Sequence, residues 1–233
     1  MATKAKKPPK LACGGKHEKA ARLSGYTCIA GVDEVGRGAL FGPVFAAAVI
    51  LSPDRPIRGL KDSKQLDREQ RELLTGRIRE RAVAHAIGAA DAYEIDRINI
   101  YQASKLAMRR AIEKLAPACD YLLTDAMPLD LGVPCQAIIH GDAKVQCIAA
   151  ASILAKTTRD QCMREWDAVF PQFGLARHKG YSTDEHMDAL RKYGPTLMHR
   201  FSFEPVRTAC SFPLWTGYDE KEEEDLAVQH ATA

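Results

Sequence analysis

Short apolar runs alternate with amphipathic segments along most of the chain. Strands are predicted where an apolar run lies between glycines or other turn residues, and helices where apolar positions recur every three or four residues. The predicted strands are 27–33, 44–51, 83–89, 121–124 and 136–139. The predicted helices are 68–79, which Asp67 can cap, 94–115, and an alanine-rich segment over 145–170; short helices and loops are expected over 173–206. Strands that alternate with helices predict an α/β fold.

Charge separates a central domain from two tails. The first twenty residues carry six lysines and one glutamate, and residues 219–225 carry six acidic residues and one lysine. Such ends are typical of solvated, disordered segments, so a basic tail is expected over 1–24 and an acidic tail over 211–233. The net charge is only +3. Overall charge therefore does not single out a nucleic-acid-binding protein, although a basic tail would add non-specific affinity for phosphates.

The cysteines and the hydropathy pattern bear on the compartment. The chain has seven cysteines and no CxxC pair, which argues against a zinc site or a disulfide framework and favours a reducing compartment. No apolar run approaches the ~18 residues of a membrane span. The basic N-terminus lacks the apolar region of a secretory signal, so a cytoplasmic location is expected.

Acidic residues stand at the ends of three predicted strands. Asp33 and Glu34 end the first strand and precede the turn Gly36-Arg37-Gly38, while Asp125 and Asp142 follow later strands. Ligands collect at strand ends in open α/β sheets, so these carboxylates are expected to converge. Converging carboxylates repel one another, and Mg²⁺ or Mn²⁺ would relieve that repulsion. Because neighbouring strand residues face opposite sides, the strand is expected to break at Asp33-Glu34 if both are to bind metal.

Other interpretations of these residues remain open. Each acid can instead cap a helix or pair with a lysine, and capping is a strong competitor for Asp142, which precedes a long helix. The segment 36–42 superficially resembles a nucleotide-binding loop, but its glycine spacing is GxGxxxG and it leads into an apolar, strand-like run. A non-catalytic nucleic-acid-binding protein is a further alternative. Metal-dependent cleavage distinguishes among these possibilities.

Several motifs in fixed order resemble the ribonuclease HII family. They span roughly 26–207 and are Gly31–Gly38, Gly42–Val44, Leu60–Lys64, Asp125–Met127, Gly141–Lys144, Ile148–Lys156, Arg159-Asp160, His178–Tyr181 and His199–Phe203. The resemblance implies an RNase H-like fold, with a central mixed sheet flanked by helices over 25–170 and a small helical C-terminal extension over 171–210.

The resemblance also implies an activity. It implies endonucleolytic cleavage of RNA in RNA–DNA hybrids and at single ribonucleotides in duplex DNA, with two divalent ions and 5′-phosphate and 3′-hydroxyl products. Roles in ribonucleotide excision repair and DNA replication, a monomeric state and a replication-clamp contact through a tail are further expectations.

Site residues follow from the same resemblance. Asp33, Glu34, Asp125 and Asp142 match the catalytic, metal-binding acids. Gly36, Arg37 and Gly38 match the turn that reads the 2′-hydroxyl, and Tyr181 matches the tyrosine that stacks on the next sugar. Contacts to the phosphate backbone are expected from Lys64, Lys144 and Arg200. The chain departs from the usual pattern at Ser182, where glycine is common, and at Phe201, where a polar or basic residue is common.

Overall fold

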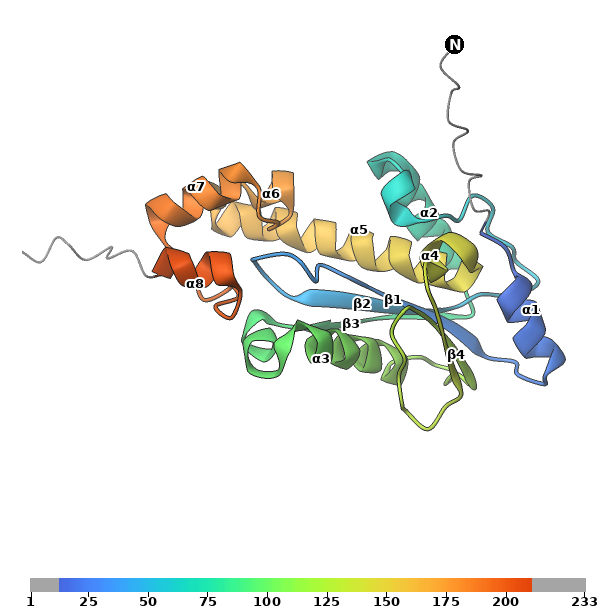
Figure 1. Ribbon diagram of the computed structural model, residues 1–233. Coiled ribbons are helices and arrows are strands. Elements are labelled where there is room, and N and C mark those ends of the chain that lie inside the picture. The colour runs from blue at the N-terminus through green and yellow to red at the C-terminus, as the bar shows by residue number, and fades with distance from the viewer. Residues whose placement is uncertain (1–12, 211–233) are drawn as a thin grey trace, which may run out of the picture.

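The computed structural model describes residues 13–210 as an α/β fold (Figure 1). Its strands are β1 (Ile29–Val35), β2 (Val44–Ile50), β3 (Ala84–Ala90), β4 (Tyr121–Asp125) and β5 (Cys135–Ile138). Its longer helices are α2 (Arg68–Arg81), α3 (Ala92–Glu113) and α5 (Gln146–Val169). The shorter helices are α1 (Lys16–Leu23), α4 (Gly141–Lys144), α6 (Leu175–His178), α7 (Asp184–Tyr193) and α8 (Glu204–Cys210), with 3₁₀ turns at Ser63–Gln65 and Pro171–Phe173.

The five strands form one mixed sheet in the order β3-β2-β1-β4-β5. β1 pairs antiparallel with β2, which pairs antiparallel with β3. On its other side β1 pairs parallel with β4, and β4 pairs parallel with β5. The expected central mixed sheet flanked by helices is therefore confirmed.

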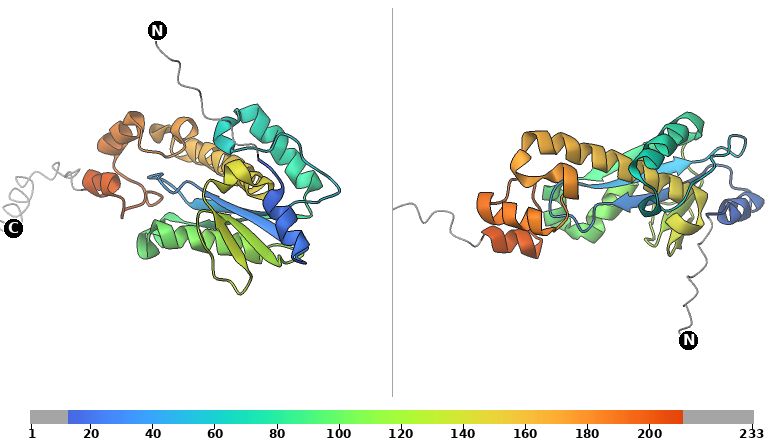
Figure 2. Two further views of the ribbon diagram at one scale, coloured as in Figure 1. Left: turned by 45° about the vertical axis from the view of Figure 1, so that its right-hand side comes forward. Right: turned by 90° about the horizontal axis from the view of Figure 1, so that it is seen from above.

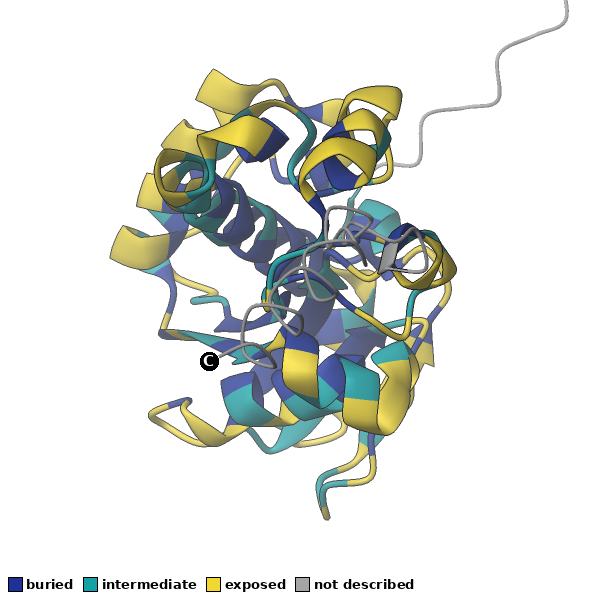
Figure 3. Ribbon diagram, turned by 90° about the vertical axis from the view of Figure 1, so that its left-hand side faces the viewer, coloured by how far each residue is buried: buried dark blue, intermediate teal, exposed yellow. Residues whose placement is uncertain are grey.

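Helices cover both faces of this sheet. α5 and α2 lie on one face and α3 lies on the other (Figures 1 and 2). Ala149, Ala150 and Ala151 are completely buried against the sheet, because alanine side chains let the axis of α5 approach the strands closely. Figure 3 shows the result, with buried positions along α5 and the strands and exposed positions on the outer helix surfaces.

Two glycines make this close packing possible. A Cβ atom on Gly31 of β1 would lie 2.1 Å from the carbonyl carbon of Cys147 in α5. A Cβ atom on Gly88 of β3 would lie 2.1 Å from the carbonyl oxygen of Ala107 in α3. Each glycine thus marks a point where a helix backbone meets a strand backbone directly.

The C-terminal helices pack around the far end of α5 (Figure 2). Their small core contains Phe41 and Phe173, and it also buries His186 and His199, which are both 0% exposed. The Nε2 atoms of these two histidines lie 3.2 Å apart. This core joins the helical extension to the loop between β1 and β2.

The structure differs from the sequence-based expectation at several elements. Residues 16–23 form helix α1 rather than part of a disordered tail. Ala21 packs in an apolar cluster with Ile29 of β1 and Leu123 of β4, and the buried Glu18 accepts a hydrogen bond from the first turn of α5. α3 begins at Ala92 behind an Asp91–Glu94 capping box and contains a kink at Asn99 (φ 66°, ψ 162°). β1 continues two residues further than predicted. The remaining parts of the predicted tails, 1–12 and 211–233, lie outside the described residues. No helix within 13–210 is long and apolar enough to cross a membrane.

Candidate active site

Parallel pairing of β1 with β4 brings two of the predicted acids together. The register aligns Val32 with Thr124, so the next residues, Asp33 and Asp125, end up beside each other. Asp33 lies two residues after Gly31 and therefore faces α5, whose Ser152 side chain lies beside its carboxylate. Ser152 was not anticipated as a site residue, although it is the only hydroxyl within the alanine-rich run 149–155.

Asp142 completes the cluster from the short helix α4. The amide of Gly141 donates a hydrogen bond of 2.8 Å to Oδ1 of Asp125, which ties the start of α4 to the end of β4. One carboxylate oxygen from each of Asp33, Asp125 and Asp142 lies within 4.8 Å of the other two. The N-cap residues of α4 and of the long helix α5 are His140 and Val145, so Asp142 occupies neither N-cap position.

These carboxylates repel one another strongly. Burial raises the pKa of Asp33 well above its ordinary value, and the charges of Glu34, Asp125 and Asp142 raise it further. Burial and the charge of Asp125 also raise the pKa of Asp142, which Lys64 partly counteracts. A divalent cation coordinated by hard oxygen ligands is the simplest way to relieve this repulsion at neutral pH.

Glu34 occupies a different position from the one expected. β1 remains regularly paired through Asp33, Glu34 and Val35, so the predicted strand break at the acidic pair is wrong. Glu34 consequently starts from the opposite face of the strand and lies outside the group of three aspartates. Its Oε1 accepts a hydrogen bond of 3.3 Å from Arg37, while its Oε2 is buried with no hydrogen-bond partner among residues 13–210.

The turn after β1 is tied to the segment that carries Tyr181. The amide of Leu40 donates a 2.7 Å hydrogen bond to the carbonyl of Gly180, and Ala39 forms a β-bridge with Tyr181. Gly36 has φ +90°, which favours glycine, whereas no atom of the described chain comes within 4 Å of a Cβ built on Gly38. The structure therefore brings the predicted turn and the predicted tyrosine together, with Arg37 and Gly38 exposed.

Two buried arginines lie beneath this turn. The guanidinium of Arg159 lies 5.3 Å from the centre of the Tyr181 ring, and a Cβ atom on Gly36 would collide with its Nε. Arg200 donates 2.9 Å hydrogen bonds to the carbonyls of Arg37 and Gly42. Arg200 is 0% exposed, so the expected phosphate contact is corrected: its guanidinium holds the turn from inside the protein. Arg159 was not predicted as part of the site.

The two predicted lysines lie on either side of Asp142. Lys64 is exposed, and its Nζ is 3.9 Å from Oδ2 of Asp142. Lys144, at the end of α4, donates a 2.6 Å hydrogen bond to the carbonyl of Ile139. The two departures from the family pattern, Ser182 and Phe201, are both exposed, and the amide of Phe201 donates to Asp96.

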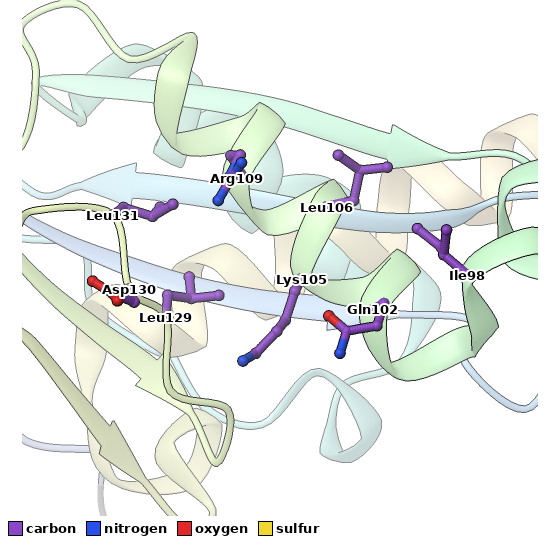
Figure 4. A pocket seen from close by; sticks show the side chains of 8 residues that line it. All are labelled: Ile98, Gln102, Lys105, Leu106, Arg109, Leu129, Asp130 and Leu131. Carbon is purple, nitrogen blue, oxygen red and sulfur yellow. The ribbon is translucent and has the colours of Figure 1, made fainter.

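A separate surface groove of about 510 Å³ lies between α3 and the loop after β4 (Figure 4). Leucine and isoleucine side chains line it together with Gln102, Lys105, Arg109 and Asp130. None of the clustered aspartates lines this groove. The candidate chemistry therefore belongs to the strand ends on the α5 side of the sheet.

A mixed α/β sheet with carboxylates gathered at the ends of its parallel strands is typical of metal-dependent enzymes, among them metal-dependent hydrolases. The family model described as Ribonuclease HII matches residues 30–206. The chain belongs to the ribonuclease HII family, whose members are divalent-metal-dependent RNase H endonucleases of type 2.

Individual relatives agree with this assignment. The chain is 63% identical over 205 residues to a ribonuclease HII of Solibacter usitatus (strain Ellin6076), covering 88% of this chain and 90% of that protein. A crystal structure of ribonuclease H2 from Pyrococcus horikoshii OT3 matches with a TM-score of 0.67 at 25% identity, over 78% of this chain and 97% of that one. The RNase HII of Archaeoglobus fulgidus, solved in a complex with PCNA, matches with a TM-score of 0.67 at 24% identity, over 80% and 98% of the two chains, and supports the fold.

Proposed function

We propose that this protein hydrolyses the RNA strand of RNA–DNA hybrids and also cuts at single ribonucleotides embedded in duplex DNA, leaving 5′-phosphate and 3′-hydroxyl ends. The observation that carries this proposal is the convergence of Asp33, Asp125 and Asp142 beside a glycine turn that is bonded to the Tyr181 segment. The aspartates supply a place for metal ions, and the turn and tyrosine supply a place to read the sugar.

The donor set fits two divalent ions. Asp33, Asp125 and Asp142 offer hard oxygen ligands within 4.8 Å of one another. Oε2 of Glu34, which is buried and has no hydrogen-bond partner among the described residues, offers a further ligand oxygen. Mg²⁺ and Mn²⁺ both suit such a set. When bound, a pair of ions activates the attacking water and stabilises the leaving 3′-oxygen.

The protein's own groups orient these ligands. The Ser152 hydroxyl lies beside the Asp33 carboxylate, and the same hydroxyl is 3.0 Å from the hydroxyl of Ser63. The Gly141 amide fixes Asp125. Lys64, beside Asp142 but largely exposed, can contact a phosphate of the bound strand next to the reacting group. Lys144 is proposed to contact the backbone further along α4.

Recognition of the ribonucleotide is assigned to the turn and to Tyr181. The 2′-hydroxyl alone distinguishes RNA from DNA at a given nucleotide, and reading it requires close approach of rigid polar groups. Gly38 lets the backbone approach the sugar because no side chain intervenes. The Tyr181 ring, held over Arg159, offers a flat face to the adjacent sugar.

The proposed substrate suggests a cellular role, a location and a partner for this protein. We assign the protein to ribonucleotide excision repair and replication in the cytoplasm, where the free cysteines of the described region would stay reduced. A monomeric state and a replication-clamp contact through a tail complete the proposal. Residues 1–12 and 211–233, where such a contact would lie, are outside the described part of the chain.

One assay tests the proposal. A labelled DNA duplex with a single internal ribonucleotide, a matched RNA–DNA hybrid and an all-DNA duplex are incubated with the protein in Mg²⁺, Mn²⁺ or EDTA. We expect cleavage of the first two substrates, none of the third, and none in EDTA, with a 3′ end that a polymerase can extend. Cleavage that persists in EDTA contradicts the metal mechanism, and binding without cleavage supports the alternative of a non-catalytic nucleic-acid-binding protein.

A further inference from the structure

The N-terminal helix α1 delivers a buried carboxylate to the first turn of α5. The first amides of a helix have no partner within the helix, and the N-cap residue of α5, Val145, supplies no side-chain hydrogen bond. Glu18 of α1 fills this role, because its Oε1 accepts a 3.0 Å hydrogen bond from the amide of Cys147. Glu18 is only 5% exposed, so this contact is shielded from solvent.

A second contact ties the same two segments together. The amide of Gly14 donates a 3.0 Å hydrogen bond to the carbonyl of Lys144, and Gly14 forms a parallel β-bridge with Val145. Residues 14–18 therefore hold residues 144–147 by backbone and side-chain bonds. This stretch directly follows Asp142 and includes the junction between α4 and α5.

The peptide groups around Cys147 are also where α5 meets β1. The Cys147 carbonyl carbon would lie 2.1 Å from a Cβ on Gly31, so strand and helix are in direct backbone contact there. Asp33 lies two residues after Gly31 on the same face of β1, and Asp142 lies five residues before Cys147. The Cys147 backbone therefore lies on the path of direct contacts that joins Asp33 to Asp142.

We propose that Glu18 is a positioning residue for the metal centre, which holds Asp142 at its working distance from Asp33 by fixing the start of α5 against β1. This inference rests on the proposed metal-dependent cleavage. Glu18 touches neither metal nor substrate and acts through the backbone of α5. A carboxylate at a helix N-terminus is stabilised by the helix dipole, which favours Glu18 at this position, although its Oε2 is buried with no hydrogen-bond partner among the described residues.

The electrostatics of Cys13 agree with this arrangement. Burial raises the pKa of the Cys13 thiol to about 12, with contributions from the charges of Glu18 and Asp142. The backbone bond from Gly14 to Lys144 independently brings the N-terminal segment to a point two residues along the chain from Asp142.

The test compares Glu18→Ala with a matched loss of a helix cap on the other face of the sheet. Asp91 caps α3 by accepting a 2.7 Å hydrogen bond from the amide of Glu94, and it belongs to no part of the site. Both Glu18→Ala and Asp91→Ala are expected to lower the Tm by roughly 2–6 °C, since each removes one cap. Mn²⁺ binding is then titrated by calorimetry without substrate, alongside the cleavage assay.

The expected difference lies in metal affinity. Glu18→Ala should raise the Mn²⁺ dissociation constant by about 10-fold or more, as loss of a group that orients a ligand does. Asp91→Ala should leave it at the wild-type value. Glu18→Gln retains an acceptor oxygen of the same reach and should restore most of the affinity. Glu18→Asp keeps the charge but is one methylene too short, so it should behave like alanine and serves if Glu18→Ala does not fold.

The outcomes separate the two proposals. If the wild-type protein neither binds Mn²⁺ nor cleaves, the proposed function fails and the role of Glu18 fails with it. If the wild-type protein does both, but Glu18→Ala and Glu18→Asp bind Mn²⁺ as tightly as Asp91→Ala, Glu18 contributes only stability and the positioning role is wrong.

Discussion

The two halves of the site bury charges of opposite sign. On the α5 side of β1, three aspartates converge, and Ser152 of α5 lies beside one of them, Asp33. Beneath the glycine turn, Arg159 and Arg200 are both 0% exposed, and neither forms an ion pair with a carboxylate of the described residues. Burial and the neighbouring charge of Arg159 lower the pKa of Arg200 to about 9. Each half is thus electrostatically unfavourable by itself.

The two halves differ in the source of the groups that interact with their charged side chains. The arginine half is held mainly by protein groups, because Arg200 donates to the carbonyls of Arg37 and Gly42 and Arg159 packs on Tyr181. Three buried nitrogens, Nε and Nη1 of Arg159 and Nη2 of Arg200, have no hydrogen-bond partner among residues 13–210. The aspartate half brings acceptors together and supplies no matching cation of its own beyond the exposed Lys64. The comparison teaches that the turn and Tyr181, which we propose read the sugar, are held by protein groups, whereas the aspartate half depends on a cation from outside.

Asp33→Asn is the most severe way to break the aspartate half. Losing a metal ligand removes several kcal/mol of transition-state stabilisation, so the cleavage rate should fall by at least about 10³-fold. Binding of an RNA–DNA hybrid, measured by fluorescence anisotropy, should survive because the arginine half is intact. Asp130→Asn, an exposed carboxylate outside the cluster, is the matched control and should cleave normally.

The same variant should be more stable than wild type when no metal is present. Neighbouring charges and burial raise the pKa of Asp33, which means that its ionised form is unfavourable in the folded state at neutral pH. In EDTA the Tm of Asp33→Asn should therefore exceed that of wild type, and the increase in Tm on adding Mn²⁺ should be lost. A lower Tm in EDTA would mean that the aspartates are not under mutual repulsion.

Gly36→Ala tests how rigidly the arginine half is packed. The added Cβ would lie 2.2 Å from Nε of Arg159, at a backbone φ of +90°. Overpacking of this kind costs about 1–3 kcal/mol, so the Tm should drop by roughly 3–10 °C and cleavage should decline with it. Thermal unfolding and kcat/KM at a single ribonucleotide measure the two effects.

Gly38→Ala is the companion variant from the same turn. No atom of the described chain comes within 4 Å of a Cβ at this position, so the Tm should stay unchanged. Cleavage should nevertheless slow, because the methyl group would stand where the turn approaches the sugar. Equal losses of Tm in the two variants would show that the turn is not divided into a packed side and a substrate side.

The contrast between these glycines also marks what the sequence can reveal. Alternating apolar segments and glycine boundaries predict the sheet and long helices, since they depend on local periodicity. The clustering of Asp33, Asp125 and Asp142 follows from strand ends that meet at one edge. The face of Glu34, however, depends on whether β1 stays paired, and pairing with β2 beyond Asp33 is a tertiary property.

Arg200 and Glu18 illustrate the same limit more sharply. A basic residue in a motif of a nucleic-acid enzyme is expected to contact phosphate. Arg200 is instead buried, and it donates to backbone carbonyls about 160 residues earlier in the chain. Glu18 has lysines near it in the sequence, which predicts a solvated tail. In the structure it is buried and accepts a hydrogen bond from the amide of Cys147. Burial of a single charged residue is decided by distant partners, which local composition does not encode.

Tyr181→Ala should weaken discrimination without removing chemistry. Loss of an aromatic stacking surface costs about 1–3 kcal/mol, so cleavage at a single ribonucleotide should fall by about 10-fold or more. Cleavage within a continuous RNA strand should fall less, because neighbouring ribonucleotides offer alternative positions. Tyr181→Phe keeps the ring over Arg159 and should retain most of the rate. Equal losses on both substrates would assign Tyr181 to general binding instead.

The pH response of the two halves gives the finest comparison. His186 and His199 lie in the helical extension next to the Tyr181 segment, and burial is the main reason that their pKa values fall to about 4 and about 3. Below a pH of about 6.5 these histidines bind protons in the unfolded chain but stay neutral in the folded protein. The free energy of unfolding therefore decreases as the pH falls. For two such groups the loss is about 1 kcal/mol between pH 7 and pH 6. Asp33 responds with the opposite sign, because its raised pKa makes proton uptake favour the folded state.

Native-state hydrogen exchange resolves these opposing responses within one molecule. In EDTA, as pH falls from 7 to 5.5 and after correction for intrinsic exchange rates, amides of α7 should lose protection while those in the first turn of α5 gain it. Mn²⁺ should cancel the gain in α5, because the bound cation already relieves the aspartate repulsion, and should leave the loss in α7 unchanged. His199→Gln should make the α7 response shallower, since one titrating group is gone. Parallel changes in both helices would mean that the whole domain opens as one unit, and that the histidine pair and the aspartate cluster do not change stability locally.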